Sequence, residues 1–150
     1  MKRSILSALA LCLFAVQALA AEGMVNVRSS HSVNDTADRL ESVLKEKGMT
    51  VMNRVRHSES AEKAGIELRD TQLLIFGNPK VGSPLMQCQQ TVALDLPQKA
   101  LIWQDEEDVV WVSYNDPQYL VSRHGIEGCD EVIAKVSNAL AAFAKAAAGE

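Results

Sequence analysis

The C-terminal segment carries the strictest periodicity in the chain, and one of its sides needs a partner layer. Its apolar residues recur at intervals of three and four along a single stripe, as on one face of a helix: Cys129, Val132, Ile133, Val136, Leu140, Phe143 and Ala147. A helix with one apolar stripe must bury it against another element. The pattern therefore predicts a long helix that ends near Gly149 and packs on the rest of the domain.

The segments before this helix indicate what it packs on. Residues 24–31 and 49–57 alternate between apolar and polar side chains, as half-buried strands do. Between them a helix is expected from the capping-box-like Ser32 to Gly48. A second, short helix is expected over Glu59–Ala64. Thr71–Phe76 ends in four consecutive apolar residues, which favours an interior strand covered on both faces.

The second half predicts a short helix, a hairpin and a turn into another helix. Ser83 and Pro84 are typical of a helix start, so a short helix is expected over Pro84–Gln90. Lys99–Gln104 and Val109–Tyr114 form a hairpin around an acidic tip, with Trp103 and Trp111 as a cross-strand pair. The predicted fold is α+β, a two-layer β-α-β4-α sandwich. It has one mixed sheet, two long helices on one face and short helices in the connections.

The N-terminal twenty residues are typical of an export signal. Lys2 and Arg3 precede an apolar run, and Ala18-Leu19-Ala20 matches the small-x-small cleavage rule, so cleavage is expected after Ala20. Residues 21–150 then form one domain without membrane insertion. Without Lys2 and Arg3, 13 basic side chains face 19 acidic ones. This acidic balance argues against nucleic acid as a partner. The expected location is the periplasm, or the exterior if the protein is fully secreted.

Cleavage of the signal leaves two cysteines, Cys88 and Cys129, in an oxidising compartment. A disulfide between them would close a loop of about 40 residues and contribute roughly 4 kcal/mol. Two buried free thiols and a thiolate metal site remain alternatives, because the distance between the two residues does not follow from the sequence.

Three sets of residues are candidates for a functional site. The loop containing Asn78, Lys80, Gly82 and Ser83 is either a structural turn or an anion site at a helix N-terminus. The polar group Asn115, Asp116, Arg123 and His124 offers a helix cap, or a site where Asp116 orients His124 as a general base and Arg123 holds an anion.

His31 and His57 end predicted strands, and they are expected at one edge of the sheet if those strands run parallel. They would then offer metal ligands together with the thioethers of Met49, Met52 or Met86, which suit copper. The alternative is a pair of ordinary strand-end histidines. His57, Asp116 and His124 are also the candidate catalytic residues.

Several ordered motifs resemble one bacterial family. "LLIFGNPKVGSPLMQ" (73–87), "ALDLP" (93–97), "WVSYNDPQYL" (111–120) and "RHG" (123–125) are similar to the family known as domain of unknown function 302. The chain departs from the family pattern at Glu107-Asp108 and at Ser83. The resemblance implies a TATA-binding-protein-like α+β domain, and it carries no activity.

The sequence therefore favours a non-catalytic exported module that binds a small ligand or a periplasmic protein. Edge strands in so small a sheet also favour a homodimer. No cofactor fingerprint is present. The alternatives are a small-molecule enzyme with a polar site around Asn78, Asp116 and His124, and a copper- or haem-handling protein using His31, His57 and methionines.

Overall fold

The computed structural model describes residues 22–150, so the expected signal segment lies outside the described residues. The strands are β1 (Met24–Ser29), β2 (Thr50–Arg56), β3 (Thr71–Gly77), β4 (Gln98–Gln104) and β5 (Val110–Asn115). The helices are α1 (Val33–Glu46), α2 (His57–Lys63), α3 (Pro79–Cys88), α4 (Pro117–His124) and α5 (Asp130–Ala148), with a 3₁₀ turn η1 (Gln90–Leu94) before β4.

The five strands form one sheet in the order β1-β5-β4-β3-β2. Every neighbouring pair is antiparallel, so the expectation of a mixed sheet was wrong. The α1 crossover does leave β1 and β2 running in the same direction, but it carries the chain to the opposite edge. Three strands therefore separate β1 from β2. The α+β order of elements and the hairpin β4–β5 are confirmed.

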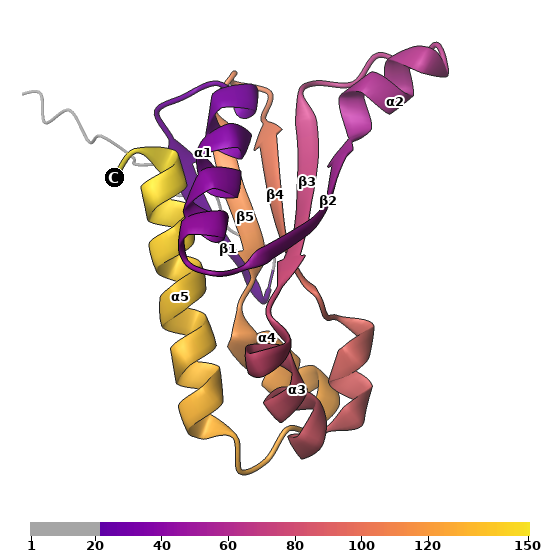
Figure 1. Cartoon of the computed structure of the whole chain (residues 1–150). Helices are drawn as coiled ribbons and strands as arrows, with labels where there is room; N and C mark the ends of the chain where they lie inside the picture. The colour runs from indigo at the N-terminus through magenta and orange to yellow at the C-terminus, as the bar shows by residue number, and fades with distance from the viewer. Residues whose placement is uncertain (1–21) are drawn as a thin grey trace, which may run out of the picture.

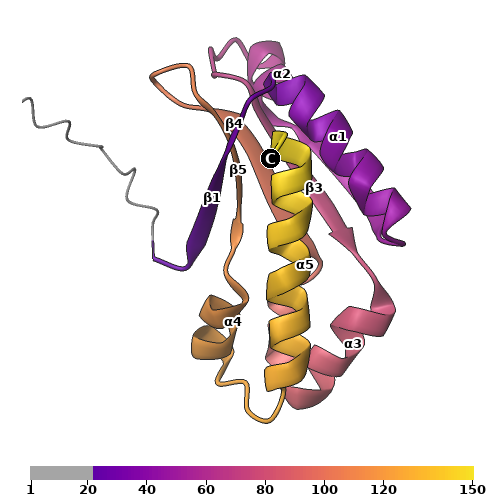
Figure 2. The same ribbon diagram turned by 90° about the vertical axis from the view of Figure 1, so that its left-hand side faces the viewer.

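Helices α1 and α5 lie side by side on one face of the sheet, and the core lies between the two layers (Figures 1 and 2). Leu40 of α1 and Leu140 of α5 are buried against Phe76, Ile102 and Val112 of the sheet. Along β3, residues alternate between buried and half-buried, because none of the described helices covers the second face. The expectation that both faces of β3 are covered was therefore wrong.

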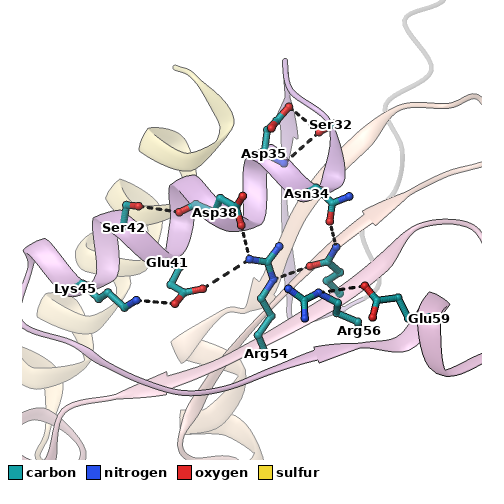
Figure 3. A network of polar contacts seen from close by, with 11 residues as sticks. Ser32, Asn34, Asp35, Asp38, Glu41, Ser42, Lys45, Arg54, Arg56 and Glu59 are labelled. Atoms are coloured by element: carbon teal, nitrogen blue, oxygen red, sulfur yellow. Dashed lines mark hydrogen bonds and ion pairs between the residues drawn. The ribbon is translucent and has the colours of Figure 1, made fainter.

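A polar network joins α1 to the β2 edge of the sheet (Figure 3). Arg54 on β2 pairs with Asp38 of α1 and donates from Nε to Gln72 Oε1 at 2.7 Å. Gln72 is buried, and its amide nitrogen donates to Asn34 Oδ1 at 2.6 Å. The buried amide of Gln72 is thus paired on both its oxygen and its nitrogen, as the cost of burying an unpaired polar group requires.

The remaining helices lie at the two ends of the sheet. Helix α2 stands out beyond one end, away from the two layers (Figure 1), and none of its residues is buried. Helices α3 and α4 lie at the other end, beside the N-terminal half of α5 (Figures 1 and 2). At that end, the long α5 has short helices as neighbours in place of the sheet.

Candidate functional site

An apolar pocket of about 540 Å³ lies between α3 and α5, at the end of the sheet. This volume falls within the range of small-molecule sites, roughly 300–1,000 Å³. One wall is the stripe of α5, with Val136, Leu140 and Phe143. Leu85 and Met86 of α3 form the opposite wall. Between these walls the lining is completed by the start of β2 with the residue before it and by the segment before β4, through Met49, Met52, Ala93, Leu96 and Pro97.

The pocket gathers three of the thioethers considered above as copper ligands, those of Met49, Met52 and Met86. Methionine is flexible and polarisable, and proteins use it on surfaces that adapt to varied apolar partners. Neither His31 nor His57 lines the pocket. The three methionines form part of the apolar wall, without the histidines that the copper hypothesis combined with them.

Two lysines are the charged residues in the described lining of the pocket. Among the described residues that line it, Lys47 and Lys135 are the charged ones, and none is acidic. Their side chains are 60% and 72% exposed, so both lysines reach solvent. Lys135 Nζ is 2.7 Å from Glu131 Oε1, and Lys47 Nζ is 3.9 Å from Glu46 Oε1. Both glutamates lie outside the lining.

The loop predicted from Asn78 to Ser83 is the first half of α3. The helix begins at Pro79, with Asn78 as N-cap, so the expected start at Pro84 was wrong. The Lys80 and Gly82 N–H groups donate to Asn78 Oδ1 and Asn78 O, each at 2.9 Å. These two N–H groups are therefore occupied within the turn, and the alternative of an anion site has no helix N-terminus at Ser83. Asn78, Gly82 and Ser83 nevertheless line the pocket, whereas Lys80 does not.

The second predicted group assembles around a residue that the sequence did not single out, Asp95. His124 Nε2 lies 2.6 Å from Asp95 Oδ2, and His124 Nδ1 lies 3.1 Å from Thr91 Oγ1. The His124 side chain is 6% exposed and that of Asp95 is 16% exposed. Arg123 Nε lies 3.2 Å from the same Asp95 oxygen.

Asp116 does not orient His124, because both ring nitrogens of His124 have other partners. The Asp116 carboxylate instead accepts from the Gln118 N–H at 2.9 Å and caps α4, as the helix-cap alternative predicted. Asn115 is exposed at the end of β5. The cluster ties the segment from Thr91 to Asp95 to α4; Ala93 of that segment and Leu96, which follows it, line the pocket. Its evident role is to hold this wall in place.

His31 and His57 do not meet. They follow β1 and β2, which lie at opposite edges of the sheet. With four interstrand spacings of about 4.8 Å, the two strands are roughly 19 Å apart. Within residues 22–150, no three His, Cys, Asp or Glu side chains are grouped so that they could hold a metal ion. The two histidines therefore cannot ligate one metal together.

Cys88 and Cys129 form a disulfide, with their Cα atoms 6.4 Å apart. The two alternatives, free thiols and a thiolate metal site, are therefore wrong. The bond joins the last residue of α3 to the N-cap of α5. Both helices are walls of the pocket, so the disulfide fixes them to each other at one end.

The second face of the sheet is the other prominent surface. Leu73 and Leu101 are register partners there, as are Trp103 and Trp111, which confirms the predicted cross-strand pair. Trp103 Nε1 donates to Ser113 Oγ at 2.8 Å, and Trp111 Nε1 donates to Asp105 Oδ2 at 2.6 Å. The tryptophan N–H groups are thus occupied within the domain.

Fold and pocket together define a two-layer α+β domain with a ligand-sized apolar site. The chain belongs to the family described as Domain of unknown function DUF302, which matches residues 25–143. A DUF302 protein from Bacillus stearothermophilus has the same fold, with a TM-score of 0.76 and 23% sequence identity. That comparison covers 85% of this chain and 99% of the other.

Three Brucella proteins are similar in sequence. Those named "Fluoride-specific ion channel FluC 1", from Brucella suis biovar 1 (strain 1330) and Brucella abortus biovar 1 (strain 9-941), are each 44% identical over 113 residues. "Fluoride-specific ion channel FluC 2" of Brucella melitensis biotype 1 (strain ATCC 23456 / CCUG 17765 / NCTC 10094 / 16M) matches equally. The matches cover 75% of this chain but only 42% to 44% of the relatives. This chain therefore spans less than half their length. None of the helices described in residues 22–150 is long and apolar enough to cross a membrane.

Proposed function

We propose that this domain is a non-catalytic binding module that holds a small hydrophobic ligand between α3 and α5. The observation that carries the proposal is the pocket itself: about 540 Å³, with walls formed mainly by aliphatic, methionine and phenylalanine side chains. Small-molecule sites are concave, largely apolar and contain few polar groups. The polar cluster at His124 supports binding over catalysis, because its members pair with one another and none of them lines the pocket.

A bulky substitution inside the pocket tests this proposal. Ala139 lines the pocket on α5, whereas Ala142, three residues further along the same helix, is exposed and does not. Ala139→Trp should fill the site, and Ala142→Trp makes the same change on the outer side of the helix. The probe is N-phenyl-1-naphthylamine, an uncharged hydrophobic dye whose fluorescence rises in apolar surroundings.

The wild-type protein and Ala142→Trp should enhance the dye fluorescence, and Ala139→Trp should not. Circular dichroism must show that both variants are folded. Equal enhancement by all three proteins would place dye binding elsewhere and defeat the proposal. Native mass spectrometry of protein purified from its own cells extends the test: a retained mass should accompany the wild type and Ala142→Trp but be absent from Ala139→Trp.

We also propose that the mature domain functions in the periplasm. The export-type N-terminus motivates this proposal, and the Cys88–Cys129 disulfide supports it, since such bonds persist in oxidising compartments. Cell fractionation followed by intact-mass measurement should give a chain that begins at Ala21 and lacks two thiol protons. A cytoplasmic chain with reduced cysteines would refute the location.

A second candidate function is support of fluoride resistance. The 44% identity to proteins named fluoride-specific ion channels favours it, although this chain spans less than half their length. Deletion of the gene for this chain should lower growth in sodium fluoride, and reintroduction of the wild-type gene should restore growth. Unchanged fluoride tolerance in the deletion strain would remove this candidate. Complementation with Ala139→Trp then shows whether the pocket takes part.

A further inference from the structure

We propose that the ligand of this pocket is an amphiphilic anion, with its hydrocarbon chain between α3 and α5 and its carboxylate held by Lys47 and Lys135. This inference deepens the proposed function and rests on it. The first observation is the sign of the charges at the pocket. The domain contains more acidic than basic side chains, yet the charged residues among the described lining are both lysines.

The second observation is how polar and apolar groups are distributed in the pocket. Val136, Leu140 and Phe143 present a continuous apolar wall along α5, and Lys135 lies on the same helix, one residue before this wall begins. Lys47 follows the last residue of α1 and is likewise largely exposed. A ligand that filled the space between the apolar walls and reached solvent would therefore place its polar end beside positively charged side chains.

The chemistry of the two lysines selects the head group. A carboxylate can accept a charge-assisted hydrogen bond from an ammonium group, and such bonds are stronger than neutral ones. A quaternary ammonium head would be repelled by the two lysines, and the Glu131 carboxylate beside Lys135 is already paired with that lysine. An uncharged alcohol would gain only neutral hydrogen bonds. The order of affinity should thus be carboxylate, alcohol, then cation.

Glu131 allows a second, independent test of the charge of the head group. Its carboxylate forms an ion pair with Lys135 Nζ at 2.7 Å, and the hydrogen bond from Lys135 holds the pKa of Glu131 below its usual value. In the free protein this glutamate stands where an incoming carboxylate would bind. Glu131→Gln leaves Lys135 without its anionic partner, so it should strengthen binding of an anionic ligand and leave binding of an alcohol unchanged.

The test uses three compounds with the same ten-carbon chain: decanoate, 1-decanol and decyltrimethylammonium. Each displaces N-phenyl-1-naphthylamine from the wild-type protein at low ionic strength and below its own aggregation threshold. An exposed ion pair contributes up to about a fivefold change in affinity, so two lysines should give decanoate an advantage of about tenfold over 1-decanol. The advantage should shrink as salt is added, because the lysines are solvent-exposed.

Matched lysine variants locate the effect. Lys47→Gln/Lys135→Gln should reduce decanoate to the affinity of 1-decanol, with 1-decanol itself unchanged. Lys63→Gln/Lys80→Gln removes the same charge from two lysines outside the lining and should retain the preference. Lys80 lies in the first turn of α3, so this control also separates the pocket lysines from the start of that helix.

Each outcome decides one of the two proposals. If the dye binds but 1-decanol competes as well as decanoate, the anionic head is wrong and the hydrophobic pocket stands. If the dye does not bind at all, both proposals fall. Co-sedimentation with phosphatidylglycerol vesicles distinguishes a free amphiphile from a bilayer surface. Vesicle binding that is lost in Lys47→Gln/Lys135→Gln and exceeds decanoate binding would assign the lysines to a membrane and overturn the inference.

Discussion

Removal of the Cys88–Cys129 disulfide should destabilise the domain by about 4 kcal/mol. The two residues are 41 positions apart, and the chain-entropy model gives about this value for a loop of that length. The protein should be compared with Cys88→Ala/Cys129→Ala, which removes the bond without placing a hydroxyl at the buried position 129. The loss is large beside the 5–15 kcal/mol that typically separates folded from unfolded domains.

Urea unfolding followed by circular dichroism at 25 °C measures this loss. With a slope of roughly 2 kcal/mol per molar urea, the midpoint should fall by about 2 M. Wild-type protein unfolded in the presence of a reductant should lose a similar amount, because it too lacks the cross-link. This second measurement separates the effect of the bond from the effect of the alanines.

A loss of less than about 1 kcal/mol of unfolding free energy in both measurements would refute this prediction. That result would mean that the unfolded chain already keeps α3 and the start of α5 close together, so that the bond removes little entropy from it. A loss in the alanine variant alone would assign the effect to packing around position 129. The variant should also bind the hydrophobic dye more weakly, because the bond joins the two helices that form opposite walls of the pocket.

Three further predictions test other parts of the structure. The hydrogen bond from Lys45 lowers the pKa of Glu41, with a smaller contribution from the Arg54 charge, so Glu41 contributes stability that is present above pH 4.5 and lost as the pH falls through its folded-state pKa. Glu41→Gln should reduce the slope of unfolding free energy against pH below 4.5. Asp95→Asn should cost about 1–3 kcal/mol in urea unfolding and weaken dye binding, because it breaks the bond that holds the pocket segment to α4, whereas Arg123→Gln should cost less. We predict a homodimer with twice the monomer mass in sedimentation equilibrium; Leu101→Glu should halve that mass if the open sheet face forms the contact and leave it unchanged if the edge strands do, while the exposed change Leu94→Glu should leave it unchanged in either case.

The order of elements could be predicted because it depends on local patterns. Each of these patterns lies within one short stretch of sequence: the apolar stripe of α5, the alternation in β1 and the acidic tip of the hairpin. The structure confirms the three elements that they predicted. Strand order could not be predicted in this way. It depends on which distant segments pair, and the α1 crossover could have placed β2 beside β1 instead of at the far edge of the sheet. The histidine metal site was wrong for this reason.

The start of α3 shows a different limit. Asn78-Pro79 and Ser83-Pro84 are both N-cap and first-residue pairs, and proline inside a helix is normally costly. The sequence therefore favoured the later pair. In the structure the earlier one begins the helix, and Pro84 is only its sixth residue. Pro84 has no N–H to donate to the carbonyl of Lys80, four residues earlier in the helix. Lys80 lies in the exposed first turn, where water can donate to that carbonyl instead.

The pocket could not be predicted from any one motif, because it depends on where α5 lies along the sheet and on which elements cover its N-terminal half. Helix α5 has 19 residues and extends about 28 Å, whereas strands of six or seven residues extend roughly 20–24 Å. The apolar stripe of α5 therefore runs past the sheet, and α3, η1 and α4 must cover the surplus (Figure 2). Rotation of α3 toward α5 would close the space, but the disulfide holds the last residue of α3 at the start of α5, and Asp95 holds the neighbouring segment to α4. The helix that requires a covering layer is thus also the one along which room for a ligand remains.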